Sequence, residues 1–117
     1  MMTIQECYAK IGGDYEGVVG RLRKDERILK YLNLFAAGND YELIVNALNA
    51  ENYEEAFRNV HNLKGVSLNL GLTPLHKTSD VLCEALRHGK PEMDITGMLN
   101  DVKETYDRVV AVLKELA

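Results

Sequence analysis

The stretch that decides the fold class is residues 52–70, NYEEAFRNVHNLKGVSLNL. Apolar or small residues recur in it at alternating steps of three and four positions: Tyr53, Ala56, Val60, Leu63, Ser67 and Leu70. That spacing follows one side of a helix and is typical of helices packed in a bundle. Gly71 stands where a left-handed C-cap belongs, so we predict that this helix ends there.

Two further helices are predicted after this one. Thr73 and Pro74 read as an N-cap followed by a first-turn proline, and the helix they open is expected to end at Gly89, with His88 in its last turn. After Pro91, a final helix runs to the end of the chain. The connections are short, so neighbouring helices are expected to be antiparallel. The two apolar stripes are Leu75, Ser79 (or Thr78), Leu82 and Leu86, and then Ile95, Met98, Val102, Tyr106, Val109, Leu113 and Leu116.

The first half of the chain leaves one alternative open. Residues 4–11 can form a short helix stopped by two glycines, and Asp14 is a plausible N-cap for a second one. Residues 36–40, AAGND, read locally as a turn, yet the apolar phase continues across them to Leu48. Because a glycine inside a helix costs only about 1 kcal/mol relative to alanine, one long helix and two shorter ones both fit. The predicted fold class is all-α in either case.

Composition excludes several classes of function. The chain has 117 residues, which is one domain's length, and no apolar run long enough to span a membrane. The first residues do not resemble a secretion signal. A formal net charge of -4 gives no general attraction for nucleic acid. Cys7 and Cys83 form no CxxC pair, so we expect a reduced, cytoplasmic protein.

The residues that could carry chemistry are His61, Lys64 and Gly65. His61 and Lys64 each follow a core position, so both are expected at the edge of the buried stripe, within reach of water. Gly65 lies one turn beyond His61 on the same face, and glycine inside a helix is unfavourable unless something must approach closely. A neutral imidazole near an ammonium group suits attack on a phosphoryl group. Arg58, three residues before His61, adds a cation on that face.

The same residues also allow interpretations in which they have no chemical role. His61 could be a surface histidine, Lys64 a solvated charge and Gly65 a helix-packing contact. A zinc site formed by His61, His76 and Cys83 is conceivable from the residue types, but no HxxxH or CxxC spacing supports it, and we expect no metal. No glycine-rich nucleotide loop is present, so self-phosphorylation from ATP is not expected.

The motif His61-x-Leu63-Lys64-Gly65, with Leu70-Gly71 and Leu75 at fixed distances, resembles the histidine-containing phosphotransfer (HPt) domain of two-component phosphorelays. Residues 12–15, GGDY, and residues 84–87, EALR, are similar to the small single-domain bacterial type. The resemblance implies an antiparallel up-down four-helix bundle over residues 25–117, with an N-terminal helical cap over residues 1–24. It also implies a helix that continues through Gly38.

The same resemblance implies the roles of the site residues. His61 would accept a phosphoryl group from the aspartyl phosphate of a receiver domain and pass it to another receiver. Lys64 would stabilise the phosphate, and Gly65 would let the partner approach. Many family members carry Gln or Glu 22 residues after the acceptor, where this chain has Cys83.

The expected partners are receiver domains and hybrid histidine kinases. We expect Arg58, Lys64 and Lys77 to form a basic patch that complements an acidic receiver pocket. Leu68 is expected to complete the contact, His76 to contribute to the rim, and Cys83 to be among the partner-binding residues. No bound cofactor is expected, because the receiver would supply Mg²⁺, and a monomer is the simplest state. The alternative function is a helical adaptor that performs no phosphotransfer.

Overall fold

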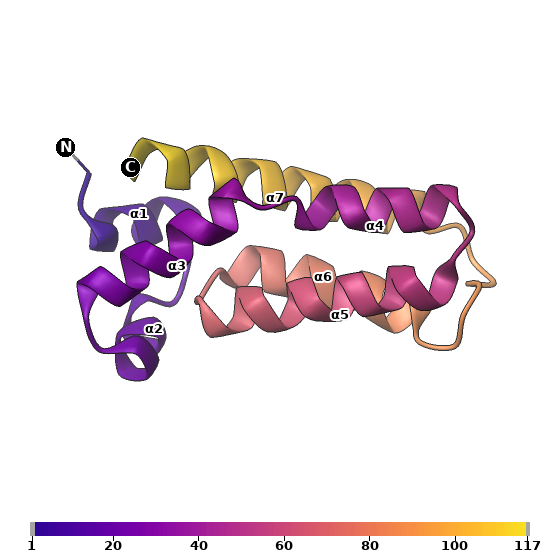
Figure 1. Ribbon diagram of the computed structural model, residues 1–117, viewed down its shortest axis with the longest axis horizontal. Helices are drawn as coiled ribbons and strands as arrows, with labels where there is room; N and C mark the ends of the chain where they lie inside the picture. Colours follow the sequence, from indigo (N-terminus) through magenta and orange to yellow (C-terminus); the bar gives the residue numbers. More distant parts are fainter. Residues whose placement is uncertain (1, 117) are drawn as a thin grey trace.

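The computed structural model describes residues 2–116, which are all-α and contain seven helices and no strand (Figure 1). This confirms the predicted fold class. The helices are α1 (Ile4–Ile11), α2 (Tyr15–Leu22), α3 (Asp25–Ala37), α4 (Asp40–Asn49), α5 (Tyr53–Asn69), α6 (Thr73–Leu86) and α7 (Thr96–Leu116).

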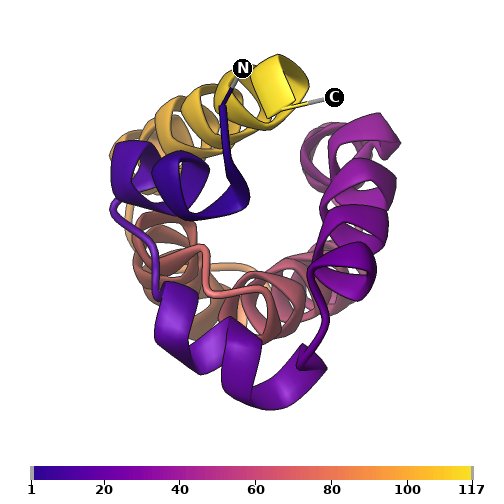
Figure 2. The same cartoon turned by 90° about the vertical axis from the view of Figure 1, so that its left-hand side faces the viewer.

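The bundle is formed by α4 to α7, which run alternately in opposite directions along the long axis (Figure 1). Short turns join α4 to α5 and α5 to α6, as expected for antiparallel neighbours. The helices α1 and α2 lie across one end of the bundle, together with α3 (Figure 2). At that end, an ion pair of 3.1 Å joins Lys10 of α1 to Glu115 near the C-terminus of α7.

The helix is interrupted at Gly38. The continuous helix implied by the resemblance is therefore wrong, and the alternative of two shorter helices is correct. Gly38 has an extended backbone (φ −81°, ψ −177°), and its N–H donates to the carbonyl of Phe35, which closes α3. A new helix then begins at Asp40. The apolar phase survives this break because both helices still bury one side in the same core, through Phe35 of α3 and Ile44 of α4.

Several helix ends agree with the sequence, and two do not. Gly71 has the left-handed backbone expected of it (φ +69°), and the Asp14 carboxylate accepts a hydrogen bond from the Gly17 N–H as an N-cap. The N-cap of α6, however, is Leu72, and Thr73 lies inside the first turn. The helix also ends at Leu86, so His88 lies beyond it.

One hydrophobic core connects the end helices with the bundle. Cys7, Tyr8 and Ile11 of α1 and Val18 of α2 are buried in the same cluster as the bundle residues. The hydroxyl of Tyr8 donates a 2.6 Å hydrogen bond to the carbonyl of Leu70, directly after α5. The division into a cap of residues 1–24 and a bundle of residues 25–117 stays a prediction. None of the helices in residues 2–116 is long and apolar enough to cross a membrane.

Candidate functional site

His61 lies on the exposed surface of α5, where the sequence predicts it. Its neighbours in the stripe, Val60 and Leu63, are fully buried, which fixes the rotation of the helix and directs position 61 to the surface. The imidazole packs against the ring of Phe57, one turn earlier, with ring centroids 5.8 Å apart. The sequence analysis did not include Phe57 in the site, although its position four residues before His61 indicates this contact.

Lys64 forms an ion pair with Asp80 of α6, and the Nζ–Oδ1 distance is 2.9 Å. The Lys64 side chain is 27% exposed and that of Asp80 is 47% exposed, so the pair sits at the seam between the two helices. The hydrogen bond from Lys64 lowers the pKa of the Asp80 carboxyl, and the same bond raises the pKa of Lys64. Sequence reasoning missed Asp80, because nothing in the local pattern shows which residue of α6 faces Lys64.

His76 is half-buried and also faces α5. Its Nδ1 lies 3.2 Å from the backbone carbonyl of Lys64. A carbonyl oxygen only accepts hydrogen bonds, so this contact assigns the proton to Nδ1 and leaves Nε2 as the unprotonated nitrogen of the neutral ring. His76 therefore lies against the backbone of Lys64, and its expected contribution to the rim around His61 stays a prediction.

The antiparallel register of α5 and α6 places position 83 opposite His61. Lys64 pairs with Asp80, and the guanidinium of Arg87 lies 5.7 Å from the ring centre of Phe57. Cys83 lies three residues after Asp80 and four before Arg87. His61 likewise lies three residues before Lys64 and four after Phe57. Yet Cys83 is fully buried, and this burial raises the pKa of its thiol. The expectation that Cys83 contacts a partner is therefore wrong, because its side chain has no exposed surface to offer.

Gly65 leaves open space on the surface of α5. A Cβ placed at this glycine would meet no atom within 4 Å outside the local helix backbone and adjacent residues. The interpretation of Gly65 as a helix-packing contact is therefore wrong, since no neighbouring helix approaches it. Leu68, three residues after Gly65 on α5, is 53% exposed. Gly65 and Leu68 thus form a surface beside His61 that has no side chain at Gly65 and an exposed apolar side chain at Leu68.

The predicted basic patch is not what the structure shows. Arg58 lies within 3.5 Å of Glu54 and 3.2 Å of Glu55, and the ammonium of Lys64 is held by Asp80. Lys77 faces the other side of α6, where it lines a shallow groove with residues of α7. The sequence does not show that Asp80 of α6 faces Lys64, whereas Glu54 and Glu55 stand one turn before Arg58 on the same helix.

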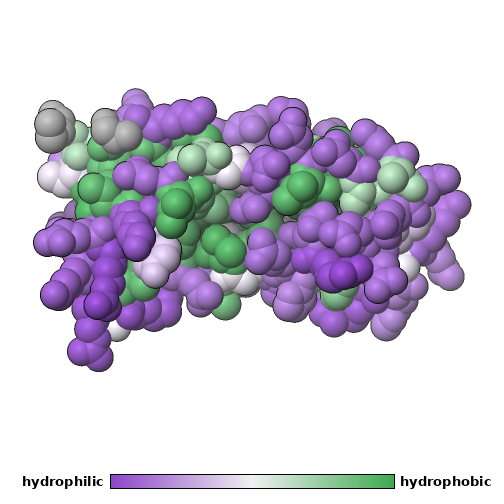
Figure 3. Space-filling view, in the orientation of Figure 1, coloured by the Kyte–Doolittle hydropathy of each residue, from purple (hydrophilic) through white to green (hydrophobic). Residues whose placement is uncertain are grey.

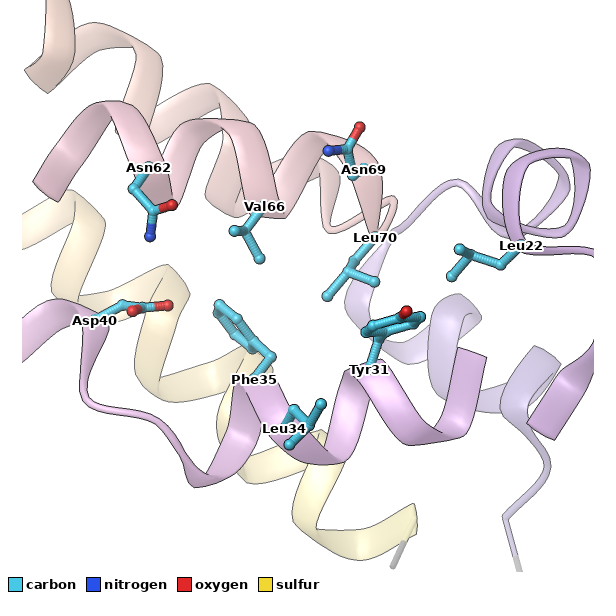
Figure 4. A pocket seen from close by; sticks show the side chains of 9 residues that line it. All are labelled: Leu22, Tyr31, Leu34, Phe35, Asp40, Asn62, Val66, Asn69 and Leu70. Atoms are coloured by element: carbon cyan, nitrogen blue, oxygen red, sulfur yellow. The ribbon is translucent and has the colours of Figure 1, made fainter. Parts of the chain in front are cut away.

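A groove of about 440 Å³ opens between α3 and α5, beside the Gly65 surface (Figure 4). Residues on both sides of the interruption at Gly38, Phe35 of α3 and Asp40 of α4, line it. Leu34 (60% exposed) and Tyr31 (43%) are large residues of this groove that reach the surface. Figure 3 shows hydrophobic residues gathered over the same end of the molecule, where α3 lies in Figure 1. The lining residues of the groove are Leu22, Tyr31, Leu34, Phe35, Asp40, Asn62, Val66, Asn69 and Leu70.

Within residues 2–116, no cluster of three or more His, Cys, Asp or Glu side chains could hold a metal ion. The zinc site considered from His61, His76 and Cys83 therefore has no counterpart in the described part of the chain.

A scan against protein families matches the Hpt domain over residues 34–112, which is more than half of the chain. The match begins near the end of α3 and includes α4, α5 and α6 and most of α7. Comparisons with curated proteins and with solved structures gave no match.

Proposed function

The chain belongs to the Hpt domain family, and on this premise we propose that His61 is its phosphoacceptor. Hpt domains take part in histidine phosphotransfer in phosphorelays, and their general partners are receiver domains and kinases. Of the three histidines, His61 alone lies on the open face of α5, beside Lys64 and the bare backbone of Gly65. The open surface at Gly65 is the observation that carries the proposal, because it lets a bulky partner approach the imidazole.

The proposed reaction is reversible transfer between an aspartyl phosphate and His61. The lone pair of the unprotonated ring nitrogen forms an N–P bond, and the P–O bond to the aspartate breaks. The aspartate leaves with that electron pair as a carboxylate, and the proton on the other ring nitrogen stays with the imidazole or passes to water. The reverse reaction onto a second receiver completes the relay. The chain is then a carrier and not an enzyme.

The residues around His61 would each have one task in this reaction. The ring of Phe57 limits the rotation of the imidazole from one side. The ammonium of Lys64, one turn away, provides the positive charge that the phosphoryl oxygens need. Mg²⁺ would be held by acidic residues of the receiver and is assigned no ligand in this chain.

The receiver would dock over Gly65, Leu68 and the groove between α3 and α5. Leu68, Leu34 and Tyr31 are large apolar side chains left 43% or more exposed on these elements. Burying these side chains against a partner gives a favourable free energy, which offsets the translational and rotational entropy lost on association. Arg58 and Lys64 are both paired with carboxylates, so we infer that apolar contact contributes more than electrostatic attraction to this docking.

A phosphorelay reconstitution tests the proposal. Receiver domains encoded in the same genome are phosphorylated with acetyl phosphate and Mg²⁺ and then mixed with the chain. We expect an acid-labile phosphoryl label on the wild type and none on His61→Gln. If wild type takes no label from any receiver but still binds unphosphorylated receivers, the adaptor alternative is favoured and the carrier proposal is refuted.

Lys64→Ala provides the second measurement. The variant should fold normally, because Lys64 lies at the surface seam, and its transfer should be slower or its phosphohistidine shorter-lived. Arg58→Ala is the matched control, since it removes a cation from the same helix whose charge is already held by Glu54 and Glu55. Equal kinetics in wild type and Lys64→Ala would remove Lys64 from the proposed mechanism.

A further inference from the structure

The ion pair between Lys64 and Asp80 means that the cation assigned to the phosphoryl group is already occupied in the unphosphorylated protein. Asp80 Oδ1 lies 2.9 Å from Lys64 Nζ at the seam between α5 and α6, where the Lys64 and Asp80 side chains stay 27% and 47% exposed. Asp80 projects from α6 one residue after Ser79, which is fully buried, so the packing of α6 fixes the direction of its carboxylate. The pair is therefore built by the helix interface and is not a chance contact of two long side chains.

We propose that Asp80 is a positioning residue that competes with the phosphoryl group for Lys64. This inference rests on the proposed function of His61. In the free protein Asp80 holds the ammonium at the seam. When His61 carries a phosphoryl group, with a charge between −1 and −2, Lys64 turns toward it and leaves the carboxylate unpaired. Asp80 thus weakens the hold of the site on the phosphoryl group and favours its release to the next receiver.

The other charged groups near this pair bear on whether Asp80 and the phosphoryl group compete for Lys64 or bind it together. His76 and Glu84 lie one turn before and after Asp80 on α6, and Arg87 pairs with Glu84 through a 3.1 Å hydrogen bond from Nε. Arg87 therefore has its own carboxylate partner, as Lys64 has. His76 is bound to the backbone of α5 through Nδ1 and, while neutral, adds no charge. Lys64, one turn from His61 on α5, is then the cation for which a phosphoryl group and Asp80 would compete.

The experiment measures the lifetime of the phosphohistidine without any receiver. The chain is phosphorylated with phosphoramidate, which labels imidazole directly, so a failure to find the right receiver does not affect the result. We expect Asp80→Asn to lengthen the lifetime roughly two- to fivefold, the range corresponding to an exposed ion pair. The same substitution should shift the transfer equilibrium with a receiver toward the phosphorylated chain by a similar factor.

Two controls keep the effect specific. Asp107→Asn breaks an exposed pair on α7, between Asp107 and Lys103 at 2.7 Å, and should leave the lifetime unchanged. In a Lys64→Ala background, Asp80→Asn should give a clearly smaller gain, because Asp80 acts through Lys64. ¹³C NMR of the Asp80 carboxyl at neutral pH adds a structural readout, since its chemical shift should change when His61 is phosphorylated and Lys64 leaves.

The outcomes are distinct. An unchanged or shorter lifetime in Asp80→Asn overturns the proposal, and a shorter one indicates that Asp80 helps by orienting Lys64 toward the phosphate. An equal gain with and without Lys64 also overturns it, because Asp80 would then act by direct repulsion. If lifetimes change as predicted but no receiver phosphorylates His61, the proposed function fails while the competition between Asp80 and the phosphoryl group stands.

Discussion

A side chain added at Gly65 should affect folding and docking in opposite directions. Gly65 lies in the interior of α5, and a Cβ there would meet nothing within 4 Å apart from the local backbone and adjacent residues. Gly65→Ala therefore gains the helix propensity of alanine without a clash inside the chain. Gly65→Gln extends a longer side chain over the same surface, where the proposed partner would have to approach.

The expected magnitudes follow from this open space. Gly65→Ala should raise the free energy of unfolding by about 0.5–1 kcal/mol, since glycine inside a helix is less favourable than alanine by that amount. For a domain of this size, the gain corresponds to an increase in Tm of about 2–4 °C. Gly65→Gln should gain roughly half as much stability. Its side chain should nevertheless weaken receiver docking about tenfold, as expected for a large group forced into a packed contact.

Urea denaturation measures stability, and titration with a receiver domain measures docking. Gly97→Ala in α7 is the matched control, because a Cβ there also meets nothing and α7 lies outside the proposed docking surface. It should leave docking unchanged and should not destabilise the fold. Loss of stability in Gly65→Ala would show that the open space is absent in solution. Undiminished docking by Gly65→Gln would refute the claim that the partner approaches over Gly65.

Three more predictions concern the fold and the charges around the site. Tyr8→Phe removes the hydroxyl that donates to the Leu70 carbonyl and should lower the free energy of unfolding by about 1–2 kcal/mol in urea denaturation; no loss would contradict a buried hydrogen bond there. Ser79→Ala should leave stability unchanged or raise it by about 1 kcal/mol, because the buried Ser79 hydroxyl has no hydrogen-bond partner within residues 2–116, and a clear loss would reveal a partner. The Asp80 carboxyl should titrate below its usual pKa of 3.8 in NMR. The stability gained from its ion pair is therefore present above pH 3.8 and lost as the pH falls through the lowered pKa. In Lys64→Ala the titration midpoint should return toward 3.8, and an unmoved midpoint would contradict the pairing.

The parts of the fold that depend on periodicity were predictable from the sequence. The stripe from Tyr53 to Leu70 predicted α5, and it also predicted that His61 lies at the edge of the core and not in it. The C-cap at Gly71 followed from the same reasoning, because only a few residue types adopt a left-handed backbone without strain.

The break at Gly38 could not be decided in the same way. The apolar phase continues from α3 into α4, so periodicity favours one helix, while the residues around Gly38 favour a turn. The difference between these alternatives is about 1 kcal/mol of local propensity, which tertiary packing easily overrides. The groove between α3 and α5 is lined from both sides of that break and was equally out of reach.

The charges of the site depend on contacts between helices. Asp80 lies 16 residues after Lys64, and its pairing follows from the antiparallel register of α5 and α6, which the sequence does not specify to the residue. The burial of Cys83 has the same origin. A position that looked available from the helical stripe is covered once the two helices pack together.

Intact-mass and peptide analysis of the phosphorylated chain tests the central claim most directly. The chain contains three histidines, so His61→Gln is compared with His76→Gln and His88→Gln after incubation with a phosphorylated receiver and Mg²⁺. We predict that the two control variants each gain one acid-labile phosphoryl group and that His61→Gln gains none. A label that persists in His61→Gln, or that is lost in His76→Gln or His88→Gln while each remains folded, would contradict the assignment of His61 as the phosphoacceptor.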